Sequence, residues 1–327
     1  MEKEIFRILP GKYKIIPNPF LAGEIIFLAQ DEQRKLLFSA NLERKEGNPQ
    51  ILHFKGVGEK DVYNVSPFFI NGELYLAGRI ESRENSDSES GFFRRENNDW
   101  ALAEDLPRFR LEDPFVSLIN GEIVFGGVQT WPLPNPEMLG FRTIFYRGDS
   151  LEDLHEFTRG PDFMKDIRLI ELPDKKIGVF TRPQDETGEW KKIGFDTIEV
   201  LDQLTPKMIS DAPLIDDQFE EGEWGGVNAA YLLESGQIGI LGHVANLGRD
   251  LNYHYRAMAF TFDPFTRESS RMEIVASRKD FPPSVSKSPK LSDVVFPGGL
   301  VANGSLVILY TGLSDAVAGT RDIPNPF

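Results

Sequence analysis

The sequence predicts an all-β fold, a five-bladed β-propeller, formed by a single domain over residues 1–327. The main observation is a β-hairpin pattern, in which an apolar run enters a tight polar turn and a second apolar run leaves it. The five copies of this pattern cover residues 67–76, 114–125, 167–180, 229–240 and 299–309. Their turns begin at residues 71, 120, 174, 235 and 303, with spacings of 49, 54, 61 and 68 residues. A hairpin that recurs every roughly 40–50 residues or more is typical of propeller blades.

The turns supply the second observation. Asn-Gly pairs begin at Asn71, Asn120 and Asn303, and both residue types tolerate the positive φ angles that a type I′ hairpin turn requires. Helical periodicity is nearly absent, and runs such as residues 256–262 alternate as outer strands do. The first 60 residues carry weaker strand signals, and we expect them to complete the last blade and close the ring.

Composition excludes several classes of function. The net charge of −15 disfavours nucleic acid and anionic membranes as partners. No apolar run is long enough to span a membrane, no secretory leader is recognisable and cysteine is absent, so we expect a cytoplasmic protein. Only four histidines are present, without metal-ligand spacing, so we expect no metal. An anion site in so acidic a chain must be built locally from a few cations.

Aligning the five copies brings out two sets of polar positions. The positions ten residues before the aligned apolar residue are Asn64, Asp113, Ile167 (beside Asp166), Asn228 and Phe296. The positions five residues after it are Arg79, Val128, Arg182, His243 and Thr311. Innermost propeller strands run along a central channel, so equivalent positions should converge near one mouth. Buried amides, carboxylates and cations are costly unless they meet a polar ligand, although they could also pair with one another around a water-filled channel.

Asp113 lies in the tripeptide Glu112-Asp113-Pro114. Proline should hold the residue before it in an extended conformation and so fix the direction of the Asp113 side chain. A carboxyl beside Glu112 in a narrow pocket should have a raised pKa and could act as a general acid. The alternative is an ordinary turn at the start of a strand.

Three cations stand at comparable places. Arg182 and His243 each end an apolar strand, and Lys165 precedes Asp166. Together they could bind a phosphate or a group of sugar hydroxyls, or each could be an ordinary surface or ion-paired cation. Asp315, after the fifth copy, could accept hydrogen bonds from vicinal hydroxyls or cap a turn. Aromatic candidates for stacking on sugar rings, or for simple core packing, are Trp131, Trp190, Trp224 and Tyr253.

Six short motifs occur in a fixed order. They are residues 77–81, 111–114, 165–166 with 179–183, 239–244, 294–300 and 310–315. In this order they resemble the five-bladed propeller glycoside hydrolases and phosphorylases, most closely glycoside hydrolase family 130, the mannoside phosphorylases. The chain departs from that pattern at Phe115, where the family has arginine, and at His243, which stands one residue late. Residues 222–228 also replace a Gly- and Pro-rich stretch of the family.

The resemblance implies an enzyme that cleaves a manno-type oligosaccharide with inversion, by phosphorolysis or hydrolysis. Asp113 would be the general acid, Arg182 and His243 with Lys165 would bind phosphate, and inorganic phosphate would be the co-substrate without any other cofactor. The residues expected to contact the sugar are Asn64, Arg79, Glu112, Asp166, Asn228 and Asp315. If phosphate does not bind, Glu221 or Glu223 could activate water instead. A homo-oligomer is left open. The alternatives are a glycan-binding propeller without catalysis and a protein-interaction scaffold, since one fold hosts many functions.

Overall fold

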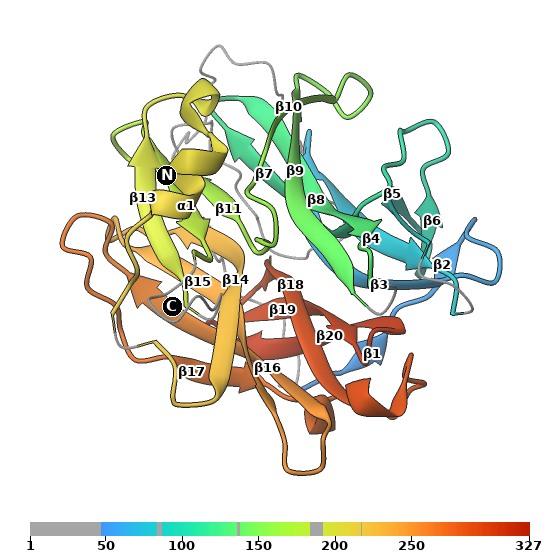
Figure 1. Ribbon diagram of the computed structural model, residues 1–327. Coiled ribbons are helices and arrows are strands. Elements are labelled where there is room, and N and C mark those ends of the chain that lie inside the picture. The colour runs from blue at the N-terminus through green and yellow to red at the C-terminus, as the bar shows by residue number, and fades with distance from the viewer. Residues whose placement is uncertain (1–46, 84–86, 136–137, 184–191, 217) are drawn as a thin grey trace, which may run out of the picture.

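The computed structural model describes residues 47–83, 87–135, 138–183, 192–216 and 218–327, and these residues form mostly β-strands (Figure 1). The all-β prediction is confirmed. The helical segments in this part of the chain are short: η1 (Leu201–Gln203), α1 (Pro206–Asp211), η2 (Arg278–Asp280) and η3 (Pro289–Leu291). None of the described helices is long and apolar enough to cross a membrane.

The described strands form antiparallel groups that follow one another along the chain. The first group is β3 (Asp61–Ile70), β4 (Glu73–Glu81), β5 (Ser88–Glu96) and β6 (Asp99–Leu102), with β2 (Phe54–Lys55) parallel to β6. The second is β7 (Glu112–Ile119), β8 (Glu122–Pro132), β9 (Leu139–Gly148) and β10 (His155–Arg159). The third is β11 (Arg168–Glu171), β12 (Ile177–Thr181) and β13 (Gly194–Ile198). The fourth is β14 (Glu223–Leu232), β15 (Ile238–Leu247), β16 (Tyr253–Phe262) and β17 (Glu273–Ala276). The fifth is β18 (Asp293–Asn303), β19 (Leu306–Leu313), β20 (Val317–Pro324) and β1 (Gln50–Ile51).

The fourth and fifth groups share one hydrogen-bonded sheet, because β16 and β18 pair in parallel at His254 and Asp293. The His254 side chain strengthens this junction. Its Nδ1 lies 2.5 Å from Asp293 Oδ2, and its Nε2 lies 3.1 Å from Asp250 Oδ1. The two carboxylates raise the pKa of His254 through these hydrogen bonds.

All five predicted hairpins are present, as the pairs β3–β4, β7–β8, β11–β12, β14–β15 and β18–β19. The turns at Asn71 and Asn120 have positive φ at both the asparagine and the following glycine, as a type I′ turn requires. The last turn differs, because Asn303 still belongs to β18 and Gly304 stands first in the turn with φ of 63°. Glycine at that position is typical of a type II′ turn.

The first strands of the five groups contact one another in a cycle: β3 with β7, β7 with β11, β11 with β14, β14 with β18, and β18 with β3. Figure 1 shows them meeting near the middle of the molecule, with the later strands of each group farther out. The short strand β1 adds to the fifth group. In β1, Gln50 pairs with Thr320 and Ile51 with Gly319 of β20, so residues near 50 complete the last group as expected; residues 1–46 lie outside the described residues.

The apolar core lies between the groups. In the described part of the chain it forms five clusters, each shared by two adjacent groups. Phe92 of the first group, for example, packs edge-on against Phe125 of the second, with ring centroids 5.2 Å apart. Fully burying such a ring contributes about 1.5–3 kcal/mol. Apolar side chains therefore fill the spaces between sheets, which leaves the inner strand ends near the centre to carry polar side chains.

Candidate active site

The polar residues of the inner strands sit at irregularities in the strand pairing. The register shifts between Tyr63 and Ser66 in β3 and between Glu112 and Phe115 in β7. Bulges of this kind re-aim side chains and are common near active sites. At these shifts Asn64 has φ of 49° and Asp113 has φ of 48°, left-handed values that asparagine and aspartate tolerate better than other side chains.

The conformation of Asp113 corrects the expectation drawn from Pro114. Proline disfavours the right-handed helical region for the residue before it, and we expected an extended residue. The backbone is instead left-handed, because the bulge turns the chain at this residue.

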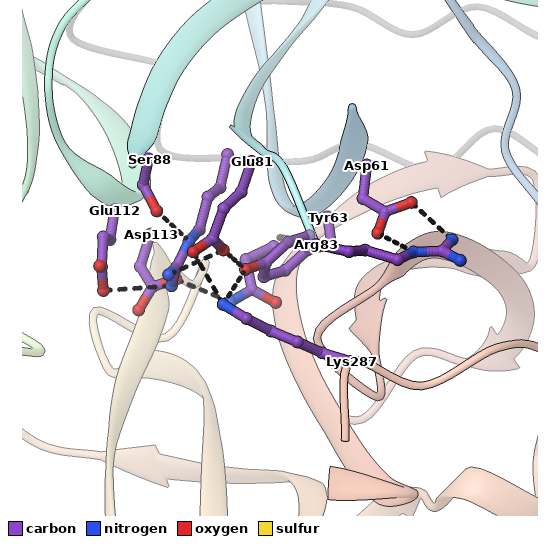
Figure 2. Close-up of polar contacts among 10 residues, drawn as sticks. Asp61, Tyr63, Glu81, Arg83, Ser88, Glu112, Asp113 and Lys287 are labelled. Atoms are coloured by element: carbon purple, nitrogen blue, oxygen red, sulfur yellow. Dashed lines mark hydrogen bonds and ion pairs between the residues drawn. The ribbon is translucent and has the colours of Figure 1, made fainter. Parts of the chain in front are cut away.

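Asp113 lies among groups that stabilise its charged form. Its Oδ1 accepts a hydrogen bond of 2.7 Å from Asn64 Nδ2 and lies 3.3 Å from Arg79 Nη1. The same Arg79 nitrogen lies 3.1 Å from Glu112 Oε2. Figure 2 shows Glu112 and Asp113 side by side. One guanidinium thus holds two neighbouring carboxyl groups of β7.

The ionisation of Asp113 is opposite to the prediction. Burial acts to raise its pKa, but Arg79, Lys165 and the Asn64 hydrogen bond outweigh burial and lower the pKa below its usual value. Burial raises the pKa of Glu112, whose contact with Arg79 does not fully compensate. The prediction of a raised pKa was therefore wrong for Asp113, because the sequence did not show that the charges of Arg79 and Lys165 would outweigh burial there. Without substrate, Asp113 is a carboxylate at pH 7.

A second polar group lies around Asp166, which has φ of 61° and is 3% exposed. Arg182 Nη1 donates a hydrogen bond to Asp166 Oδ2, and His243 Nε2 lies 3.9 Å from the same oxygen. His243 Nδ1 lies 2.8 Å from Asn228 Oδ1, and its ring stacks on Tyr255 with centroids 5.4 Å apart. Asp166 thus links Arg182, which follows β12 directly, with His243 in the middle of β15; these are two of the predicted cations.

His243 is not a cation in this environment. Burial lowers its pKa to about 4, with Arg182 and Lys165 acting in the same direction and Asp166 opposing them. The ring is therefore neutral at pH 7. It offers a hydrogen bond to a ligand, in place of the positive charge that we expected from the sequence.

Lys165 and Asp315 complete the cluster. Burial acts to lower the pKa of Lys165, but Asp166 and Asp113 raise it above its usual value, so the side chain is charged. Lys165 makes no hydrogen bond or ion pair with any described residue, and the same holds for the Asp315 carboxylate. Burial and the nearby charge of Asp113 raise the pKa of Asp315. One cation and one carboxyl group of the cluster thus retain hydrogen-bonding capacity for a ligand.

Sequence reasoning missed a polar group beside Arg79. Glu81, 2% exposed, accepts hydrogen bonds from Tyr63 Oη and, at 2.7 Å, from Lys287 Nζ. Its Oε2 also lies 3.0 Å from Arg79 Nη2 (Figure 2). Glu81 could have been found, because residues two apart on a strand share a face. Lys287 belongs to a loop far along the chain, and no local pattern marks it.

Other candidates lie apart from this cluster. Glu223 accepts a hydrogen bond from the Glu220 amide at 3.1 Å, Glu221 is exposed, and neither has a described contact with Asp113. Trp224 donates to Tyr255 Oη at 3.3 Å, whereas the Trp131 ring lies under Arg142. The Tyr253 ring is 38% exposed and packs edge-on against Trp224. Trp190 lies outside the described residues. Among those residues no group of three or more His, Asp or Glu side chains is arranged to hold a metal ion.

The fold of this chain is similar to that of a solved structure reported under the GH130 family of mannoside phosphorylases, which is 17% identical and has a TM-score of 0.59 over 89% of this chain and 97% of that chain. The β-1,2-mannobiose phosphorylase of Listeria innocua, 14% identical, matches with a TM-score of 0.56 over 86% of this chain and 92% of that chain. The family model described as "Protein of unknown function (DUF1861)" matches residues 39–327, and the chain belongs to this family. The resemblance stated from the motifs is therefore confirmed at the level of the fold.

Two solved structures are more similar in sequence. MPT-4, a mannose phosphorylase from Leishmania mexicana in complex with a phosphate ion, is 34% identical and has a TM-score of 0.80. The alignment covers 87% of this chain and 90% of that chain. MPT-1, a GDP-Man-dependent mannosyltransferase from the same organism, is 36% identical with a TM-score of 0.79, over 87% and 92% of the two chains. A search of curated proteins found no match.

The raised pKa of Asp315 predicts that replacing this residue stabilises the protein in a pH-dependent manner. A carboxyl group whose pKa is raised by folding favours the native state below its unfolded pKa, and this contribution is lost as the pH rises through the folded pKa. Asp315→Asn removes the charge and keeps a side chain that tolerates φ of 50°. We expect the melting temperature to rise by about 2 °C or more at pH 8 and to be unchanged at pH 3.5.

The matched control is Asp105→Asn, because Asp105 is exposed and its pKa is lowered by a hydrogen bond from Arg94. This variant should show no gain at pH 8. An equal gain at both pH values for Asp315→Asn would contradict an origin in the carboxylate charge.

Proposed function

We propose that this chain is a carbohydrate-active enzyme that cleaves and forms a mannosidic bond with inorganic phosphate as co-substrate. We further propose that its strand groups are the five blades of a single propeller domain, with the substrate site where the inner strands meet. A small saccharide and phosphate are then the partners. The observation that carries this proposal is the position of the Asp113 carboxylate, held by Asn64 and Arg79, in the field of Lys165, a charged lysine that makes no ion pair with the described residues.

Phosphate is assigned to Lys165 together with Arg182. Both side chains act on Asp166, and Lys165 makes no ion pair with the described residues. An anion placed between them would be held by charge-assisted hydrogen bonds, which are shorter and stronger than neutral ones. Neutral His243 could add one further hydrogen bond to the anion. This support comes from the two cations that act on Asp166 and from the phosphate-bound relative MPT-4.

Asp113 is assigned the proton that moves in the reaction. In phosphorolysis the bond between the anomeric carbon and the glycosidic oxygen breaks, and a phosphate oxygen forms a new bond to that carbon from the opposite face. The departing oxygen receives the proton of Asp113, directly or through a sugar hydroxyl. In the reverse direction the same carboxylate accepts a proton from the acceptor hydroxyl while phosphate leaves.

The lowered pKa of Asp113 suits the reverse direction without further change, since a base must be deprotonated. For phosphorolysis, bound phosphate supplies the change that is needed. A phosphate beside Lys165 offsets the lysine charge that helps to keep Asp113 ionised, and this raises the pKa of Asp113. Protonation of the acid is thereby coupled to binding of the co-substrate.

Sugar hydroxyls are assigned to the carboxyl groups with raised pKa values, Glu112 and Asp315, and to the amide of Asn64, while Asn228 is assigned to hold the His243 ring. Asp315 accepts no hydrogen bond from the described residues and can accept one from a hydroxyl, and Asn64 Oδ1 is a buried acceptor without a partner among them. Arg79 and Asp166 are assigned to hold Asp113 and Arg182 in place at the edge of the sugar site.

A second candidate is glycosyl transfer from a nucleotide sugar, which the 36% identity to the GDP-Man-dependent MPT-1 favours. Incubation of the purified protein with mannose disaccharides separates these functions. Sugar 1-phosphate formed only when phosphate is present supports phosphorolysis, and free mannose formed without phosphate indicates hydrolysis. Chain extension with GDP-mannose indicates the transferase. Saccharide binding without any turnover would overturn the enzyme proposal in favour of a glycan-binding propeller.

A further inference from the structure

The inner strands enclose a cavity of about 90 Å³. Residues of β3, β7, β11, β14 and β18 all line it, so it lies where the five strand groups meet (Figure 1). For comparison, an engineered apolar cavity of roughly 150 Å³ holds one benzene molecule. The space therefore suits a small ion with a few waters and excludes a sugar ring.

The principal charged group of this cavity is Arg168, which is 6% exposed. Its Nε donates to the Asn228 carbonyl oxygen at 2.8 Å, its Nη1 donates to the Ile167 carbonyl oxygen at 3.0 Å, and its guanidinium lies 4.3 Å from the Phe115 ring centroid. Nη2 makes no hydrogen bond with any described residue. A buried charge without a partner is costly, whereas a paired and hydrogen-bonded one is tolerated.

Several other side chains that line the cavity can donate a hydrogen bond. Asn228 Nδ2 is buried and makes no hydrogen bond within the part of the chain that the structure describes. Tyr231 Oη accepts from the Leu300 amide at 2.6 Å, which leaves its own hydrogen available. The Ser66 hydroxyl makes no hydrogen bond with the described residues, and no aspartate or glutamate lines the cavity. Several donors around one cation, without an acceptor side chain of opposite charge, are the complement of an anion.

We propose that this cavity binds a small monovalent anion, chloride under ordinary conditions, held by Arg168 Nη2 and Asn228 Nδ2 with the hydroxyls of Ser66 and Tyr231. The ion neutralises Arg168 and ties together strands of separate groups at the centre of the fold. Asp113 and Asp166 act on Arg168 from the neighbouring cluster, but neither makes an ion pair with it. The site is distinct from the phosphate position assigned above, and the inference does not depend on the proposed function.

Thermal unfolding in phosphate-free buffer tests this site, with sodium chloride compared against sodium gluconate at equal ionic strength. Gluconate is too large for the cavity. We expect chloride to raise the melting temperature in a saturable manner, by about 5 °C at a hundredfold excess over its dissociation constant. Arg168→Met should abolish this difference. The matched control is Arg267→Met, because Arg267 also donates to two backbone carbonyl oxygens and lies over a phenylalanine ring, but does not line the cavity.

Crystals grown in sodium bromide give a direct readout, since bromide scatters anomalously. The expected result is an anomalous peak within about 3.5 Å of Arg168 Nη2, a hydrogen-bonding distance for a large halide. If Arg168→Met does not fold, Ser66→Val fills part of the cavity while it keeps the arginine, and the peak should disappear. Water density alone at Arg168, or an equal chloride effect in wild type and Arg168→Met, would overturn the proposal.

Discussion

Replacing Asp113 with asparagine is expected to lower the turnover number for sugar 1-phosphate formation by about 100-fold or more, because an amide cannot donate or accept the proton that moves in the reaction. Asparagine keeps the shape of the side chain and tolerates the observed φ of 48°. Its oxygen can still accept the hydrogen bond from Asn64. The loss should therefore appear in turnover, measured under saturating saccharide and phosphate, while the far-UV circular dichroism spectrum is unchanged.

Asp61→Asn is the matched control. Asp61 lies on β3, the inner strand of the first group, and like Asp113 it pairs with an arginine, with Arg83 Nε at 2.5 Å and Arg83 Nη2 at 2.7 Å (Figure 2). It has no contact with Asp113, so its replacement should leave turnover within about twofold. Near-normal turnover of Asp113→Asn would remove Asp113 from the chemistry.

Replacing Lys165 with glutamine is expected to raise the KM for phosphate by about 10- to 100-fold, since a hydrogen bond to a charged group contributes about 1.5–3 kcal/mol. The variant should also move the pH profile. Lys165 helps to keep the pKa of Asp113 low, so its loss raises that pKa. In the synthetic direction, where Asp113 must be deprotonated, the acidic limb of the profile should shift to higher pH.

The shift of the acidic limb separates a direct role of Lys165 from a structural one, because a merely loosened site would lose activity at all pH values alike. The control is Lys176→Gln, an exposed lysine that lies 3.4 Å from Glu199 on the surface. An unchanged KM for phosphate in Lys165→Gln would contradict the assignment of phosphate to this lysine.

Much of the fold was predictable because hairpins are local. A turn such as Asn71-Gly72 restricts its own backbone, and the alternating residues on either side pair with each other without help from distant segments. The recurrence of this unit was sufficient to predict an all-β chain whose inner strands meet. The same alignment predicted that Asn64, Arg79 and Asp113 would lie near one another, because residues at equivalent positions of the repeated hairpins should converge. The structure brings these three side chains into contact.

The charge states in the site were not predictable in this way. The pKa of a buried group depends on which charges surround it and how much water reaches it. Asp113 was expected to be protonated more readily than usual and His243 to be a cation, and the structure reverses both, through Arg79 and Lys165 for the first and burial for the second. No local sequence pattern marks Lys287 or Arg168 as part of a site.

By itself the sequence determined the strand pairs, their order and the kinds of polar side chain at their ends, because these depend on neighbours a few residues apart. Only the tertiary structure decided which of those side chains meet, which are ionised, and that Arg168 lines a central cavity. The reason is that Coulomb interactions and desolvation act through space between segments far apart along the chain, and these distances exist only once the strand groups have assembled around a common centre.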